Sequence, residues 1–271
     1  MSAPAPVTAI LGSAFHTLTG TLDLERIDIE TPWGSQFLHR VTDAERPAYV
    51  LFRHDVPHRL LPNQINYRAQ AWALREVGCG ALLVTSSVGV LDAEVPLYTP
   101  LLVRDLIMLE NRLPDGSTCT MFDTPASDHG HLVLDDGLLA SALNTQLRSL
   151  AEAVEAPIAQ EEVVFAYVGG PRGKTAVENR MWPRLGAQVN SMTLAPEVVL
   201  ANELEIPCAA LVVGHKYSLP DHDPPEDRAA LADTLDRSRS EQERIVQQFL
   251  QYGTPVPFGN RIFRFNDNSD T

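Results

Sequence analysis

The stretch that decides the fold class runs from residue 63 to residue 89 and reads NQINYRAQAWALREVGCGALLVTSSVG. Its first part repeats apolar residues three and four positions apart and ends at Gly78, which predicts a helix over residues 63–77. Its second part, residues 81–85, is a continuous apolar run of the kind found in strands that are covered on both faces. A helix that leads into a buried strand ending in hydroxyl groups predicts an α/β fold.

The same alternation of strand-like and helix-like segments continues along the chain. Strands are predicted at residues 7–11, 48–52, 81–85, 101–107, 163–168, 189–192 and 208–213. Helices are predicted at residues 63–77, 138–153, 196–203 and 226–252, the third capped by Thr193 and the last ending at Gly253. This order predicts one α/β domain over residues 1–271, built round a central sheet. We expect a long loop or insertion at residues 110–131 and an irregular tail at 254–271.

Composition excludes several classes of protein. Of the 271 residues, 44% are hydrophobic and 21% are charged, so a sizeable core is available and disorder is excluded. The net charge of −14 and the lack of a basic stripe argue against nucleic acid as a partner. Apolar runs are too short for a membrane helix, and the N-terminus has no signal-peptide pattern, so we expect a cytoplasmic protein with no membrane partner. Cys79, Cys119 and Cys208 are scattered and are expected to be buried apolar residues.

Four segments place small residues, hydroxyls and basic groups where predicted strands end, which is where open α/β sheets bind ligands. They are residues 11–14 (LGSA), 52–55 (FRHD), 84–89 (VTSSVG) and 190–201 (NSMTLAPEVVLA). Backbone N–H groups, hydroxyls and the planar guanidinium of Arg53 suit an anion such as phosphate, and Glu197 could accept from ribose hydroxyls. Each segment also has an ordinary structural interpretation as a turn, a surface arginine or a helix cap. The residues alone leave both interpretations open.

Six ordered segments of this chain, covering about residues 8–250, resemble the trimeric nucleoside phosphorylases, in the branch of methylthioadenosine phosphorylase and purine nucleoside phosphorylase. They are Arg53-His54 with residues 62–69 (PNQINYRA), residues 72–74 (WAL), residues 85–89 (TSSVG), residues 170–172 (GPR) with Glu178, Met192-Thr193, and residues 196–201 (PEVVLA). The resemblance implies a mixed, partly barrel-like sheet flanked by helices. It also implies a homotrimer with an active site at each subunit interface.

The resemblance implies phosphorolysis of a nucleoside to a free base and ribose 1-phosphate or a modified ribose 1-phosphate. Inorganic phosphate is the co-substrate, and no metal or other cofactor is expected. The implied catalytic residues are Arg53, His54, Ser86 and Lys216. Phosphate is expected among Ser13, Arg53, His54, Ser86, Ser87 and Thr193. The ribose is expected at Met192, with His131 of an adjacent subunit near its 5′ end.

The expected base site departs from the family pattern. Gly173 stands where the family has a phenylalanine, and Lys174 stands where the inosine-guanosine enzymes have an acidic residue. Lys216 and Ser218 stand where the family has base-reading Asp or Asn side chains. An ammonium group only donates hydrogen bonds, so these positions favour a base with carbonyl oxygens, uracil first and hypoxanthine second. The glycine-rich first loop also departs, with Leu11 and Ala14 in place of two glycines.

The sequence leaves three possible functions open. The first is phosphorolysis of a uridine-type or 5′-modified nucleoside. The second is ordinary purine nucleoside or methylthioadenosine phosphorolysis, and the third is a non-catalytic homologue that binds nucleoside and phosphate. A nucleoside hydrolase is disfavoured, because the phosphate donors Arg53, His54, Ser86 and Thr193 are retained.

Overall fold

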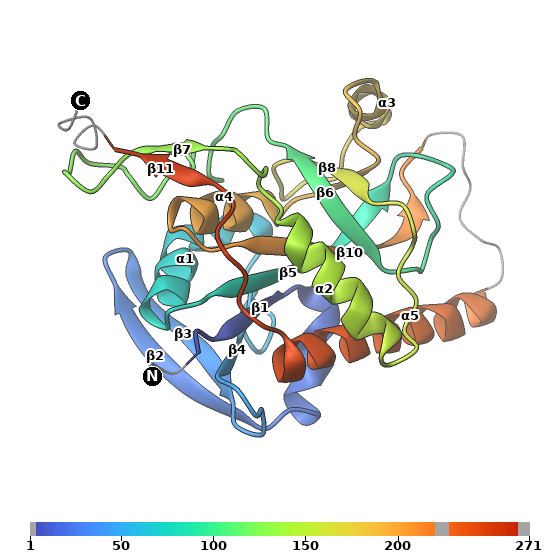
Figure 1. Ribbon diagram of the computed structural model, residues 1–271. Helices are drawn as coiled ribbons and strands as arrows, with labels where there is room; N and C mark the ends of the chain where they lie inside the picture. Colours follow the sequence, from blue (N-terminus) through green and yellow to red (C-terminus); the bar gives the residue numbers. More distant parts are fainter. Residues whose placement is uncertain (1–3, 220–227, 265–271) are drawn as a thin grey trace.

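Four parallel strands form the centre of the sheet and bring their carboxyl ends to one edge. The computed structural model describes residues 4–219 and 228–264 (Figure 1). Strand β1 (Val7–Leu11) lies between β4 (Ala48–Phe52) and β5 (Ala81–Val90), and β5 also pairs with β10 (Cys208–Tyr217). All three pairings are parallel, so the segments after these strands meet at the same side of the sheet.

The rest of the sheet closes one part into a barrel and leaves the other part open. Strands β6 (Leu101–Ile107), β8 (Val163–Tyr167) and β9 (Val189–Ser191) connect β10 back to β5, which closes a ring of strands. On the open side, β4 is followed by β3 (Gly34–Val41) and β2 (Leu24–Thr31), which pair antiparallel. The fold is therefore α/β with a mixed, partly barrel-like sheet, as expected.

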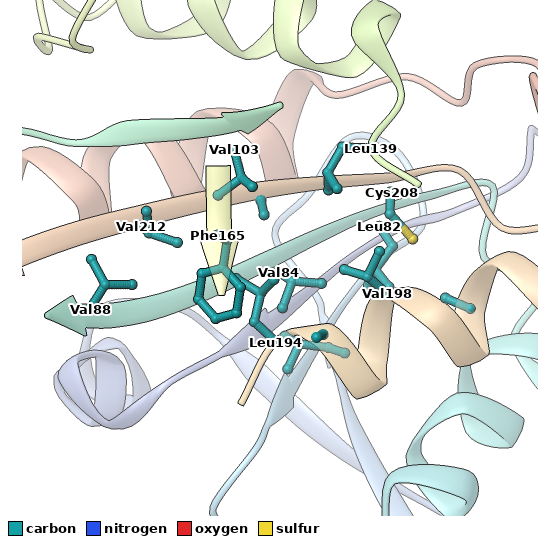
Figure 2. Close-up of a cluster of buried hydrophobic side chains, with 14 of the residues drawn as sticks. Leu82, Val84, Val88, Val103, Leu139, Phe165, Leu194, Val198, Cys208 and Val212 are labelled. Carbon is teal, nitrogen blue, oxygen red and sulfur yellow. The ribbon is translucent and has the colours of Figure 1, made fainter. Parts of the chain in front are cut away.

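Helices cover both faces of this sheet (Figure 1). Helices α1 (Tyr67–Glu76) and α4 (Ala195–Glu203) contribute to one core cluster, which Figure 2 shows around Phe165. Helices α2 (Ser141–Glu152) and α5 (Arg228–Tyr252) contribute to the second cluster. Successive side chains of β1 divide between the two clusters, Ile10 in the first and Leu11 in the second, because neighbouring strand residues point to opposite faces. Within the described ranges, no helix is long and apolar enough to span a bilayer.

Several predicted bounds are confirmed and others change. Strands β1, β4 and β6 have the predicted ends, whereas β5 and β10 continue to Val90 and Tyr217. The predicted helix over residues 63–77 is instead a 3-10 turn, η2 (Pro62–Gln64), followed by α1, because the side chain of Asn66 caps α1 by accepting from the Ala69 amide at 3.2 Å. The first residues of the predicted helix 226–252 lie outside the described residues.

The sequence prediction missed six elements. These are η1 (Ser13–Gly20), the hairpin of β2 and β3, α3 (Ala176–Arg184), β7 (His131–Val133) and β11 (Arg261–Phe263). Strand β11 corrects the expectation of a wholly irregular tail, because it pairs antiparallel with β7 in a small second sheet. Residues 265–271 of that tail lie outside the described residues. The expected long loop precedes β7 and contains one isolated bridge, between Arg112 and Thr118.

Candidate functional site

A pocket of about 550 Å³ opens at the carboxyl ends of the parallel strands. It brings together residues that follow β1, β4, β9 and residues near the ends of β5 and β10, which are far apart in the sequence. Its lining includes eleven of the twelve predicted site residues: Ser13, Arg53, His54, Ser86, Ser87, Gly173, Lys174, Met192, Thr193, Lys216 and Ser218. The structure thus brings these eleven residues together in one pocket, and their roles in binding stay a prediction.

Arg53 is fixed at the floor of this pocket, with its side chain only 1% exposed. Its Nε donates to Oε1 of Glu197, and its Nη1 donates to the carbonyl oxygen of Thr85 at 2.8 Å. Its Nη2 is buried and has no hydrogen-bond partner among the described residues. A Cβ atom at Gly12 would lie 3.1 Å from Nη1, so the glycine leaves room for the guanidinium. Arg53 thus keeps one spare donor in a pocket that it lines, which suits an anion.

Two expectations for the neighbouring groups are corrected. Glu197 is not a ribose acceptor or a helix cap: it is buried beside Arg53 and does not line the pocket. The amide of Gly12 donates to Thr85 Oγ1 at 3.0 Å, so that N–H is already used within the protein. Both changes have one cause, namely that buried polar groups of adjacent elements pair with each other.

Hydroxyl groups from two segments gather in the pocket that Arg53 lines. Ser86 Oγ lies 3.2 Å from Ser191 Oγ and 3.3 Å from Thr193 Oγ1. Thr193 is not the cap of α4, as predicted, because Leu194 occupies that position and makes no side-chain cap bond. Leu194 has a φ of 79°, a left-handed conformation that costs a non-glycine residue on the order of 1–3 kcal/mol. The turn at Leu194 connects Thr193, whose hydroxyl group lies in the pocket, to the first residue of α4.

His54 is held in a defined protonation state. Its Nδ1 lies 2.8 Å from the carbonyl oxygen of Leu60, and since a carbonyl only accepts, Nδ1 carries the proton and Nε2 is an acceptor. Burial, followed by the positive charge of Arg53, lowers the pKa of His54 to about 4, so the ring is neutral at pH 7. The ring of His58 stacks on it at 4.6 Å and also lines the pocket. No local pattern in the sequence predicts a role for His58, because its position beside His54 depends on the path of the loop after β4.

The other end of the pocket carries two ammonium groups. Lys174 is half-buried on the loop before α3, and Lys216 is exposed on β10. Burial, followed by the charge of Lys216, lowers the pKa of Lys174. A Cβ atom at Gly173 would meet nothing within 4 Å, so this position is open, and a Cβ atom at Gly89 would collide with Oγ of Ser218. No Asp or Glu belongs to the lining drawn from the described residues.

His131 lies outside this pocket. It begins β7 and lines two other hollows, beside Phe122 and Glu203. The role assigned to it in an adjacent subunit stays a prediction. Polar lining residues that the sequence prediction did not assign are Asn179, Asn190 and Ser191, besides His58.

The three cysteines are buried and free, as expected, and burial raises the pKa of Cys79 to about 11. Residues 4–219 and 228–264 hold no group of three or more His, Cys, Asp or Glu side chains that could bind a metal ion. The absence of a cofactor stays a prediction.

Comparisons with known proteins agree with this geometry. A family model described as the phosphorylase superfamily matches residues 9–251. The chain is 29% identical over 236 residues to a probable S-methyl-5′-thioinosine phosphorylase of Methanopyrus kandleri, covering 85% of this chain and 87% of that protein. It is 29% identical over 259 residues to an S-methyl-5′-thioadenosine phosphorylase of Bradyrhizobium diazoefficiens, covering 92% and 85%. A crystal structure of a double mutant of adenosine/methylthioadenosine phosphorylase from Schistosoma mansoni, in complex with adenine, has the same fold, with a TM-score of 0.79, 19% identity and 91% of each chain covered.

Proposed function

This chain belongs to the phosphorylase superfamily as a nucleoside phosphorylase, a pentosyltransferase, and on that basis we propose that it cleaves a 6-oxopurine nucleoside with a thioether at the 5′ carbon. Nucleoside and phosphate are its substrates. The observation that carries the proposed base is the lining of the pocket, which holds two ammonium groups and no carboxylate among the described residues.

The phosphate end of the pocket supports attack by hydrogenphosphate. Arg53 offers its unpartnered Nη2, and the hydroxyls of Ser86 and Thr193 can donate to further oxygens. Neutral His54 can accept the remaining P–OH proton at Nε2, because its Nδ1 is already bonded to the Leu60 carbonyl. Holding the nucleophile against the anomeric carbon lowers the barrier, and its negative charge stabilises the oxocarbenium-like sugar. We propose Ser13 and Ser87 as further phosphate contacts, and inorganic phosphate as the only co-substrate.

The base end supports a 6-oxopurine. The O6 and N7 atoms of such a base are two adjacent acceptors, which is the edge that lysine and arginine recognise in guanine. A 6-aminopurine presents a donor in place of O6, and an ammonium group cannot pair with it. Leu60, Leu61 and Pro62 give the pocket an apolar wall, which suits a thioether better than a hydroxyl. The relative from Methanopyrus kandleri is named for such a substrate.

Two features of the expected enzyme extend beyond a single chain. We propose a homotrimer in which His131 of one subunit approaches the 5′ end of the sugar bound by its neighbour. The location of His131 on β7, outside the pocket of its own chain, supports a role across subunits. Mass measurement of the protein in solution tests this proposal, and a stable monomer at micromolar concentration would contradict it.

A second candidate substrate is S-methyl-5′-thioadenosine. The amide oxygens of Asn179 and Asn190 belong to residues that line the pocket and could accept from a 6-amino group. The relative from Bradyrhizobium diazoefficiens is named for this substrate. Both named relatives act on purine nucleosides by their names, so a purine replaces uracil as the first choice of base.

The deciding experiment measures free base by chromatography, with and without phosphate, for four nucleosides. These are S-methyl-5′-thioinosine, S-methyl-5′-thioadenosine, inosine and uridine. We expect phosphate-dependent release, with the highest kcat/KM for S-methyl-5′-thioinosine. A higher kcat/KM for S-methyl-5′-thioadenosine would show that the lysines do not read O6. Base release that is independent of phosphate would contradict phosphorolysis itself.

A further inference from the structure

Lysine is confined to the pocket in this chain. Of the 21 basic residues, 19 are arginine, and the only two lysines, Lys174 and Lys216, both line the pocket. Arginine and lysine serve equally as surface charges, but arginine stays protonated in proteins, whereas a buried lysine readily loses its proton. The placement of both lysines indicates a role in which a proton is released.

The surroundings of Lys174 favour that release. Two charged side chains act on its pKa: Lys216 on β10 lowers it, and Glu178 on α3 raises it. Glu178 is an incomplete counter-charge, because Arg172 binds both of its carboxylate oxygens, at 2.9 Å and 2.6 Å. Neither lysine forms an ion pair with a carboxylate in the described part of the chain. The remaining titratable groups of the lining are His54, His58 and Arg53.

We propose that Lys174 is the general acid that protonates the departing base, and that the positive charge of Lys216 favours the release of this proton. The inference rests on the proposed function. In the step, an oxygen of phosphate forms a bond to the anomeric carbon, and the electron pair of the glycosidic bond moves to the base. The Nζ proton of Lys174 moves to N7 of the purine, which leaves a neutral amine that solvent protonates before the next turnover.

The electrostatics agree with this assignment. Burial and the charge of Lys216 both lower the pKa of Lys174, which brings a lysine closer to the neutral range in which general acids are effective. A second cation beside a lysine is an established way to obtain such a pKa. Lys216 is the more exposed of the two lysines, and its positive charge acts on the half-buried Lys174.

The first test separates proton transfer from binding. Lys174→Arg retains a cation and hydrogen-bond donors but cannot give up its proton, so we expect kcat to fall by about 10²-fold or more with little change in KM. In an N7-methylated form of the same nucleoside, the base departs as a neutral molecule without gaining a proton. On this substrate, the kcat of Lys174→Arg should therefore stay within about threefold of the kcat of the wild type. Equal losses on both substrates, or no loss on either, would overturn the assignment.

The second test observes the two amines directly in the full chain. Because only two lysines are present, ¹⁵N-lysine labelling gives two Nζ signals. The Nζ signal of Lys174 should titrate below the ordinary pH range of lysine. Lys216→Met should move the titration of this signal to higher pH, and the alkaline limb of the kcat/KM profile should move with it. Lys216→Arg retains the charge and should leave that limb in place. Ordinary titration of both signals in the wild type would overturn the inference.

The two failures can be distinguished. If wild-type protein releases base with phosphate while Lys174→Arg behaves like wild type, the inference fails and the proposed function stands. If wild-type protein releases no base from any purine nucleoside, the proposed function fails, and the inference fails with it.

Discussion

The buried pair of Arg53 and Glu197 gives the sharpest prediction for stability. Both side chains are only 1% exposed, and Oε2 of Glu197 has no hydrogen-bond partner among the described residues. Glu197→Gln retains an oxygen that accepts from Arg53 Nε but removes the only carboxylate that pairs with this buried guanidinium within residues 4–219 and 228–264. Loss of one member of a buried ion pair costs about 3–5 kcal/mol, and we expect about 3 kcal/mol for Gln and about 5 kcal/mol for Ala.

Thermal unfolding followed by circular dichroism measures this loss. At about 2–4 °C per kcal/mol for chains of this size, Tm should fall by on the order of 10 °C for Glu197→Gln. Saturating phosphate should raise Tm in this variant at least as much as in the wild type, because phosphate then supplies the missing counter-charge to Arg53. In Glu197→Ala the phosphate effect should be smaller, since the guanidinium is no longer held in position.

A matched control lies on the same helix. Glu203 is half-buried on α4, and it accepts from Thr120 Oγ1 at 2.9 Å and from the Met121 amide rather than from Arg53. Glu203→Gln should leave the phosphate-dependent shift of Tm unchanged. An unfolding free energy of Glu197→Gln within about 1 kcal/mol of the wild-type value would refute the reasoning, because the carboxylate would then not be the counter-charge of Arg53.

Three further predictions concern the phosphate end of the pocket. Gly12→Ala puts a Cβ atom 3.1 Å from Arg53 Nη1, so displacement of the guanidinium should raise the KM for phosphate roughly tenfold in initial-rate measurements, with the KM for nucleoside unchanged. Arg53→Lys retains the charge but cannot reach Glu197, the Thr85 carbonyl and phosphate together, so loss of about 1.5–3 kcal/mol should raise the same KM by roughly 10- to 100-fold. The pKa of His54 is about 4 in the folded chain, below the value of 6.5 expected when unfolded, so the unfolded state binds a proton first as pH falls. Urea unfolding should therefore show stability declining from about pH 6.5 to about pH 4, with a shallower decline in His54→Gln; equal slopes would contradict the lowered pKa.

The sequence predicted the elements whose formation depends on local apolar runs. Residues 7–11 and 48–52 are continuous apolar strands, and the polar residues after them meet at one edge because parallel strands share a direction. The hairpin of β2 and β3 was missed because most of its residues are exposed or only half-buried, so neither strand is a continuous apolar run, and the two strands are held by pairing with each other. Helix α3 buries only Trp182 toward the core, so it lacks an apolar face, although its capping box of Thr175 and Glu178 is a local signal that could have identified it.

Most of the predicted residues do line one pocket, but the contacts between side chains around it could not be predicted. Arg53 and Glu197 are separated by 144 residues, and each has a plausible role on its own in the sequence. Only the tertiary fold, which brings Glu197 in the first turn of α4 beside Arg53 after β4, shows that Glu197 pairs with Arg53 rather than the sugar. The stacking of His58 on His54 likewise depends on the path of a loop, which local periodicity does not encode.

The absence of carboxylates from the pocket lining, in the described part of an otherwise acidic chain, has a kinetic consequence. A net charge of −14 repels phosphate at long range, whereas the pocket cations attract it only on close approach. Salt screens distant charges first, with a Debye length of about 10 Å at 0.1 M, and screens direct contacts least. The association rate constant for phosphate should therefore rise with moderate ionic strength, the reverse of the fall expected when an anion is steered by a cationic surface. The protein surface acts as an electrostatic barrier to its own co-substrate, and the salt concentration of the surrounding medium sets its height.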